Sequence, residues 1–199
     1  AVAPKLSSSD TRYIQEIAKG FPKMAVLAAR QNGRSRPTIS SAGEILKRVV
    51  WGRRHYVEEA QRALELLSLF DWVGLGGRVA EEGRLIAENL GGMTQDAFVE
   101  HIRSFISRGV IVQREESYQV SPIPLAAFLA ATRLTIVKDK ILSFFLEAPL
   151  RLKISLFRRW RWLDTSQEAK AFARTLLAVD YMGNLETLNT EWGAESLDH

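Results

Sequence analysis

The stretch "VIVQREESYQVS", residues 110–121, is the part of the sequence that decides the fold class. Three β-branched residues lead into a polar turn, and Tyr118 and Val120 alternate with polar residues after it. Two such runs on either side of a turn are typical of a β-hairpin. Elsewhere the apolar residues recur with helical spacing, so we expect a mostly α chain that contains one hairpin.

Three helices are predicted before the hairpin. The first runs from about Tyr56 to Phe70, the second from Arg78 to Asn89, and the third follows the N-cap residue Thr94. Three helices and then a hairpin is the order of a winged helix, so we predict a winged-helix domain at residues 56–121. We interpret Gly74–Gly77 as a loop, because it lacks the third glycine of a dinucleotide fingerprint. The residues expected to face the core are Ala60, Ala63, Leu64, Leu67 and Phe70 in the first helix, Val79, Leu85, Ile86 and Leu90 in the second, and Phe98, Ile102, Phe105 and Ile106 in the third.

The segment before the winged helix, residues 1–55, is predicted to be a small helical domain. An amphipathic helix from Asp10 to Lys19 stops at Gly20. A second helix begins at Pro22, because the fixed φ of proline is tolerated in the first turn of a helix. A third helix follows the capping box Ser41-Ala42-Gly43-Glu44.

After the hairpin, residues 122–199 are predicted to form an α-helical array or the start of a sensor region. Consecutive helices with short links suggest helical hairpins that stack as in a solenoid. The expected helices span about 125–134, 138–147, 149–163, 166–178 and 184–192.

The composition excludes several classes of protein. The 199 residues include no cysteine, so disulfides, thiolate nucleophiles and zinc sites built on cysteine are excluded. The sequence also lacks a Gly-x-x-x-x-Gly-Lys-Ser/Thr phosphate loop, a Gly-x-Ser-x-Gly motif and a His-Glu-x-x-His motif. We therefore predict no catalytic residue, no metal site and no enzyme activity in this fragment. Because no apolar run reaches 18 residues, we expect no membrane partner and a cytoplasmic location.

The net charge of +4 is distributed unevenly. Residues 19–54 contain nine Lys and Arg against one Glu, and residues 133–163 contain eight basic against two acidic residues. Residues 164–199 contain two basic against seven acidic residues. Such blocks bind nucleic acid, phosphate or an acidic partner, or they form solvated faces and pair within the chain. Both interpretations stay open.

The third helix of the predicted winged helix is a poor candidate for DNA recognition. Its N-terminal half presents Asp96 and Glu100, and the turn of the hairpin is Arg114-Glu115-Glu116. These carboxylates repel phosphate, as do the glutamates of the second helix, of which we expect the adjacent Glu81 and Glu82 to be solvated. DNA binding is therefore disfavoured, and use of the winged helix for protein packing or intramolecular switching fits these charges better. The glutamates of the second helix are Glu81, Glu82 and Glu88.

A second stretch, Arg158-Arg159-Trp160-Arg161, is a candidate interaction patch. Its combination of cations with an aromatic ring can stack bases or bind acidic peptides. The same residues also fit an amphipathic helix in which Trp160 packs into the core and the arginines are solvated. We favour this second interpretation and keep the first as an alternative.

Residues 10–29, "DTRYIQEIAKGFPKMAVLAA", resemble the Gly-x-Pro segment of the STAND class of P-loop ATPases, the signal-transduction ATPases with numerous domains. The order of small helical domain, winged helix and helical array is similar to the region that follows the nucleotide-binding core in this class. The resemblance implies that Pro22 packs against the adenine of ATP or ADP and that Gly20 permits the backbone turn. Many members also have a histidine near the end of the winged helix that senses the phosphates, whereas Tyr118–Pro122 contains none.

The resemblance implies a regulatory fragment that lies downstream of an ATPase domain of the same chain, in a class that includes bacterial defence proteins. No cofactor is expected in the fragment itself, because the ATPase domain holds the nucleotide. The nucleotide state would bias the packing of the winged helix, and a protein ligand or self-association through the helical region would release it and lead to oligomerisation. Two alternatives stay open: a winged-helix transcription regulator that binds DNA, and a helical scaffold for protein interactions.

Overall fold

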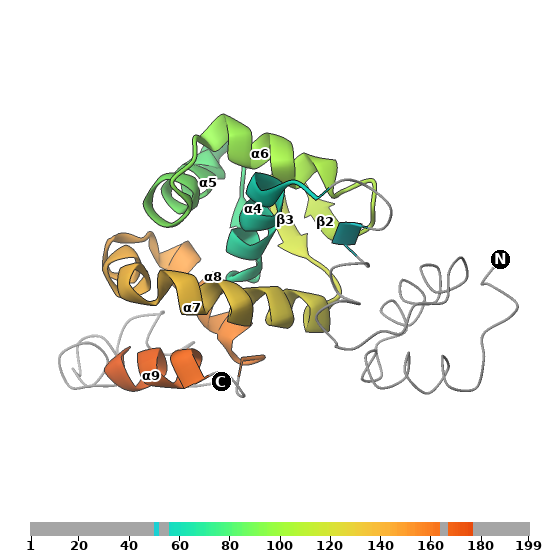
Figure 1. The fold of residues 1–199 in the computed structure, drawn as a ribbon. Coiled ribbons are helices and arrows are strands. Elements are labelled where there is room, and N and C mark those ends of the chain that lie inside the picture. The colour runs from blue at the N-terminus through green and yellow to red at the C-terminus, as the bar shows by residue number, and fades with distance from the viewer. Residues whose placement is uncertain (1–49, 52–55, 164–166, 177–199) are drawn as a thin grey trace, which may run out of the picture.

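The structure is a computed structural model that describes residues 50–51, 56–163 and 167–176. Within these ranges the chain is mostly helical and contains a small three-stranded antiparallel sheet (Figure 1). The Gly20–Pro22 segment and the helices predicted before it and directly after it lie outside the described residues, as does the helix predicted at 184–192. Among the helices that are described, none is both long and apolar enough to cross a membrane.

The helices predicted before the hairpin are present. The first is α4 (Glu58–Ser68). The second consists of the 3-10 turn η1 (Gly77–Val79), α5 (Ala80–Leu85) and the π-helical turn η2 (Ile86–Gly91). The third is α6 (Gln95–Ser104), and Thr94 caps it as predicted, because the Thr94 hydroxyl accepts a hydrogen bond from the Ala97 amide at 3.3 Å.

The predicted hairpin is also present, and it belongs to a larger sheet than the sequence indicated. Strands β2 (Ile111–Arg114) and β3 (Ser117–Val120) pair antiparallel, with Val112 opposite Gln119. A third strand, β1 (Val73–Gly74), pairs with β3 on its other side, so the strand order is β1-β3-β2. The interpretation of Gly74 as part of a plain loop was therefore wrong. A strand of two residues is too short to show alternation, so it gives no periodic signal in the sequence.

The helical region after the hairpin differs from the prediction in one respect. The two helices expected at 125–134 and 138–147 are one helix of 25 residues, α7 (Ile123–Glu147). No glycine or proline separates the two segments, and Leu134, Val137 and Ile141 continue the buried stripe across the expected break. The helices α8 (Leu150–Trp160) and α9 (Gln167–Leu176) follow, within the spans predicted for them.

The core is built around α4. Figure 1 shows α6 above this helix and α7 below it, and α9 lies against the far side of α7. Residues of the segment 56–121 and of α7 belong to one continuous buried cluster, which includes Leu64, Phe98 and Leu129. The five residues of α4 and its C-terminal end that were expected to face inward are all buried, as are Ile86, Leu90, Phe98, Ile102 and Phe105. The domain boundary near residue 121 stays a prediction, and the core continues across it.

Candidate functional site

Helix α8 has an apolar and a polar stripe that contact the rest of the chain, and Arg151 is the exposed member of the polar one. Leu152, Leu156 and Trp160 form an apolar stripe that joins the core. Arg151, Ser155 and Arg159 lie four residues apart, and side chains at this spacing project from one side of a helix. We call these three residues the polar stripe of α8. Each of them contacts the chain segment that runs from the end of α4 into β1 and α5.

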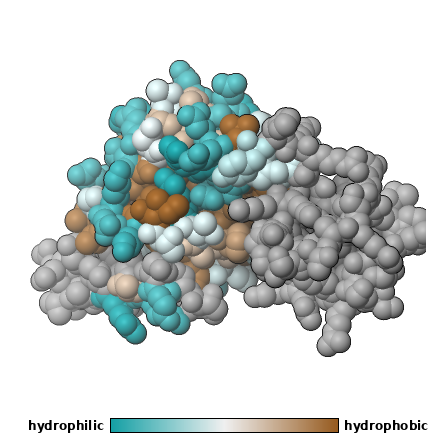
Figure 2. Space-filling model, in the orientation of Figure 1, coloured by the Kyte–Doolittle hydropathy of each residue, from teal (hydrophilic) through white to brown (hydrophobic). Residues whose placement is uncertain are grey.

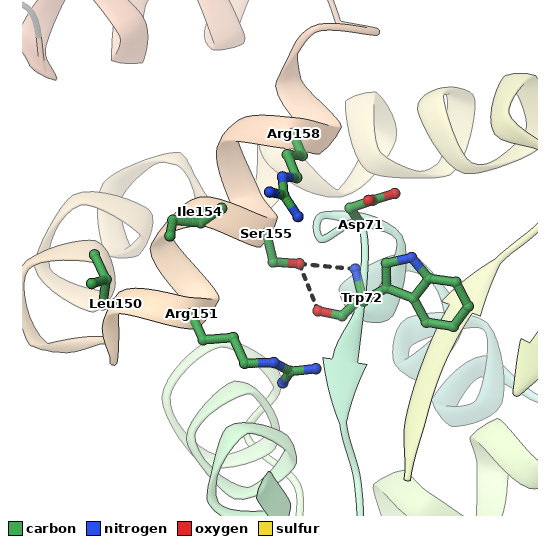
Figure 3. Close-up of a pocket in the computed structure, with 7 residues that line it drawn as sticks. All are labelled: Asp71, Trp72, Leu150, Arg151, Ile154, Ser155 and Arg158. Atoms are coloured by element: carbon green, nitrogen blue, oxygen red, sulfur yellow. Dashed lines mark hydrogen bonds between the residues drawn. The ribbon is translucent and has the colours of Figure 1, made fainter. Parts of the chain in front are cut away.

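Ser155 is the centre of the polar stripe. Its hydroxyl accepts a hydrogen bond from the Trp72 amide at 2.9 Å and donates one to the Trp72 carbonyl at 2.6 Å (Figure 3). The Asp71 amide also donates to the Ser155 carbonyl at 3.0 Å. One serine therefore satisfies both backbone groups of the residue that precedes β1, which fixes α8 along this edge of the sheet.

Arg151 forms the N-terminal contact of the polar stripe. Its guanidinium pairs with the Glu82 carboxylate and donates to the Ser117 hydroxyl at 2.8 Å. Glu82 also accepts a hydrogen bond from the Gly74 amide at 2.7 Å and is only 4% exposed. The expectation that Glu82 is solvated was therefore wrong, because α8 and β1 both supply donors that compensate for its burial. Glu81 and Glu88 are exposed and pair with Arg84.

Arg159 forms the C-terminal contact of the polar stripe and is fully buried. Its Nε donates to the Phe70 carbonyl at 3.2 Å, and its Nη2 lies 3.6 Å from Oδ1 of Asp71. Burial lowers the pKa of Arg159 to about 10, and the nearby Asp71 carboxylate opposes this shift only in part. Within the described part of the chain, Nη1 and Nη2 donate no hydrogen bond. The expectation that the arginines of the predicted patch are all solvated was wrong for Arg159.

A groove of about 570 Å³ runs between α8 and the residues before β1. Figure 3 shows Arg158 and Asp71 on opposite sides of this groove, with Ser155 between α8 and the Trp72 backbone. The apolar part of its lining comes from Leu150 and Ile154, and Leu150 is 46% exposed. The groove therefore combines apolar and cationic side chains of α8 with the Asp71 carboxylate, which comes from the segment before β1.

The predicted patch does not form one surface. Arg158 lines the groove and Arg161 is exposed, whereas Arg159 and Trp160 point into the interior. Trp72 lines the groove together with Arg158, and Trp162, two residues after Trp160, is 47% exposed. A patch that uses all four predicted residues at once is therefore not available to a partner of this folded chain.

The surface of α6 and the hairpin turn carries the charges that the sequence predicted. Asp96, Glu100 and Arg103 are exposed on α6, and Arg114, Glu115 and Glu116 are exposed at the end of β2 and in the turn. Figure 2 shows that the side of the molecule over α5 and α6 is mostly hydrophilic. This surface is polar and bears more carboxylates than cations.

Arg108, which follows α6, packs against aromatic residues of the core. Its guanidinium lies 4.5 Å from the centroid of the Phe105 ring and 5.2 Å from that of Trp51, and it donates to the Val50 carbonyl at 3.3 Å. These contacts hold the side chain against aromatic rings. Arg103 is therefore the exposed cation of this helix that a phosphate could reach.

The sequence contains a signal for the polar stripe that the spacing of the apolar residues alone does not reveal. Polar residues at i, i+4 and i+8 in α8 lie beside the apolar stripe rather than opposite it, which marks them as candidates for burial. Their partners could not be predicted, because β1 gives no signal of its own. Among the described residues, no group of His, Asp and Glu is arranged to hold a metal ion.

Comparisons of the chain with protein-family models, with curated proteins and with solved structures return no match.

Proposed function

We propose that residues 56–121 form a winged-helix unit that serves as a protein-packing module in a regulatory switch, and that α7 to α9 begin the helical region through which the switch is read out. The proposal places the protein in the cytoplasm. It also extends the resemblance to STAND-type ATPases. An upstream domain of the same chain would hold ATP or ADP, Pro22 would pack against the adenine, and Gly20 would permit the backbone turn. The observation that carries the proposal is the excess of carboxylates over cations on the surface formed by α6 and the hairpin turn.

That surface is unfavourable for a nucleic acid and suitable for a protein. A winged helix that reads DNA inserts the N-terminal part of its third helix into the major groove, where its side chains meet base edges and phosphates. Here that part carries Asp96 and Glu100, and the turn that would approach the backbone carries two more glutamates. Phosphate contact supplies most of the affinity of DNA-binding proteins, so this surface lacks the main attractive contribution.

The contacts of α8 also fit a packing module. The polar stripe holds the helical region against the sheet through hydrogen bonds and ion pairs to Trp72, Glu82 and Phe70. The polar groups of this stripe recover hydrogen bonds to water when they separate. Leu152, Leu156 and Trp160 of the same helix add an apolar contribution to the interface. Directional polar contacts beside an apolar stripe give the helical region one defined position on the sheet, which a packing module requires.

The proposal is tested by titrating labelled duplex DNA with the 199-residue chain at low and at physiological salt and measuring fluorescence anisotropy. We expect no saturable binding at either salt concentration. Saturable binding with a steep salt dependence that is weakened by Arg103→Ala would refute the proposal. Arg161→Ala, which removes an exposed arginine remote from α6, is the matched control.

A second measurement addresses catalysis. We expect the purified chain to show no ATP turnover, because it lacks a phosphate-binding loop. Saturable ATP hydrolysis that a point substitution abolishes would contradict the regulatory assignment.

A further inference from the structure

We propose that a buried polar network on α4 couples residues 50–51 to α7, so that the position of Trp51 changes how firmly α7 is held on the core. The network consists of Trp51, Gln61, Glu65 and Arg133, and we call it the α4 network. This inference rests on the proposed function and deepens it, because it names residues that would transmit a movement of the segment before α4 to the helical region.

Residues 50 and 51 are held on the core by specific contacts. Trp51 is buried, and its indole Nε1 donates a hydrogen bond to Oε1 of Gln61 at 2.7 Å. The Trp51 ring also meets the Phe105 ring edge to face, with 5.6 Å between the centroids. Arg108 packs over the Trp51 ring and donates to the Val50 carbonyl. Both the backbone and the side chain of this segment therefore have a defined position against α4 and the residues that follow α6.

Gln61 joins Trp51 to Glu65. Its Nε2 donates to Oε1 of Glu65 at 2.8 Å, one turn further along α4. Because the amide oxygen accepts from Trp51 and the amide nitrogen donates to Glu65, the two hydrogen bonds together fix the orientation of the amide. Gln61 and Glu65 are both buried. Loss of the indole donor therefore leaves a buried acceptor without its bond, which favours a rearrangement of the amide.

Arg133 is the member of the α4 network that comes from α7. It is buried, and it is the single charged residue between positions 123 and 137. Its Nη2 donates to the Leu90 carbonyl in the last turn of η2 at 3.2 Å, and α7 packs against α4. Burial lowers the pKa of Arg133, whereas the negative charge of Glu65 opposes this shift and the positive charge of Arg62 adds a smaller effect in the direction of burial. Glu65 is therefore close enough to support the Arg133 charge.

Glu65 is thus shared by two contacts that hold different parts of the chain. A carboxylate supports a buried cation best when its own position is fixed, and Gln61 and Trp51 fix it here. Withdrawal of Trp51 would weaken the support of Arg133 and with it the hydrogen bond that holds α7 to η2. The coupling is reciprocal, so loss of the Arg133 charge also weakens the hold on Trp51.

The test is a double-mutant cycle on the 199-residue chain, measured by urea denaturation followed by circular dichroism. Trp51→Phe removes the indole donor and retains an aromatic ring beside Phe105. Arg133→Met removes the cation and retains a long side chain. We expect the double variant to lose less stability than the two single variants together, with a difference of about threefold or more in the unfolding equilibrium constant. Additive losses are the result of independent structural roles and would overturn the inference.

The same cycle in a Glu65→Gln background identifies the charge as the link. Glutamine still accepts a hydrogen bond from Gln61 but carries no charge, so we expect the two substitutions to become additive there. A threefold difference that persists in this background would overturn the inference. Arg84→Met, which removes an exposed arginine of α5, takes the place of Arg133→Met in a matched control cycle and should be additive with Trp51→Phe.

A second measurement does not require the double variant to fold. The chain contains five tryptophans, and in isotope-labelled protein the indole N–H signal of Trp51 is assigned by its loss in Trp51→Phe. We expect this NMR signal to move in Arg133→Met and to keep its position in Arg84→Met. A signal that does not move in Arg133→Met would overturn the inference. These outcomes leave the DNA and ATP measurements unaffected, and saturable DNA binding would refute the proposed function without changing the cycle, so the two proposals fail separately.

Discussion

Replacement of the buried Arg159 by methionine should stabilise the protein. The side chain is fully buried, and its pKa falls to about 10 because the charged form loses hydration. A decrease of that size from the ordinary pKa of arginine corresponds to roughly 3 kcal/mol that burial costs the charged form at neutral pH. Methionine has a similar length and fills irregular core space, so its introduction removes this cost without a large cavity.

The substitution also removes favourable contacts. The Phe70 carbonyl loses its donor, which costs about 1–2 kcal/mol. Asp71 keeps the hydrogen bond from Gln119 at 2.5 Å and is partly exposed, so it retains solvation when the guanidinium is gone. Removal of one partner of a buried ion pair destabilises a protein when the other charge is left buried without a partner, and the exposure and remaining hydrogen bond of Asp71 avoid this penalty. The net expectation is therefore a gain of about 1–2 kcal/mol.

Urea denaturation followed by tryptophan fluorescence measures this gain as a shift of the midpoint, by about 0.5 M, at an unchanged slope. The control is Arg158→Met, which changes an exposed arginine of the same helix and should alter stability by less than about 0.5 kcal/mol. The advantage of Arg159→Met should also shrink above pH 10, because the unfolded wild-type chain then binds more protons than the folded one and its stability rises with pH. A loss of stability of 1 kcal/mol or more, roughly the size of one hydrogen bond, would refute the reasoning and show that the buried charge is needed.

Two further substitutions test the parts of the fold that position the site. Thr94→Ala removes the cap of α6 and should lower stability by about 1 kcal/mol in thermal denaturation followed by circular dichroism, whereas Thr132→Ala, in the middle of α7, should have little effect; equal melting temperatures would contradict the assigned cap. Gly74→Ala places a Cβ 2.7 Å from the Val79 carbonyl oxygen and closer still to the Val79 side chain, so β1 must shift at a cost of about 1–3 kcal/mol. Gly92→Asn is its control, since Gly92 has a φ of 62° and open space around it, and asparagine tolerates that conformation; if urea denaturation gives the two glycine variants the same stability, the close packing of β1 is not important.

The helices and the hairpin could be predicted because their signals are local. The Thr94 cap, the recurrence of Phe98, Ile102 and Phe105, and the alternation after the polar turn each depend on residues within a few positions of one another. The expected break within α7 was wrong, because no glycine or proline separates the two segments and the packing of α7 against α4 supports one continuous helix.

The candidate site could be predicted only in part. Arg158 and the neighbouring arginines were identified from their combination with an aromatic ring. The contact of Arg159 with the Phe70 carbonyl and the pairing of Arg151 with Glu82 could not be predicted. The contacts that define the site join residues 71 or 72 to residue 155, 83 or more positions apart in the chain. Sequence spacing does not encode distances of that kind.

By itself, therefore, the sequence determined a mostly helical chain with one hairpin, an acidic third helix, and the absence of cysteine chemistry, because periodicity, capping and composition are properties of neighbouring residues. Only the tertiary structure decided that two residues at Val73–Gly74 form the edge of a sheet and that one stripe of α8 completes it. The reason is that burial reverses the usual behaviour of polar side chains: serine, glutamate and arginine favour solvent until the fold places donors and acceptors within reach of them.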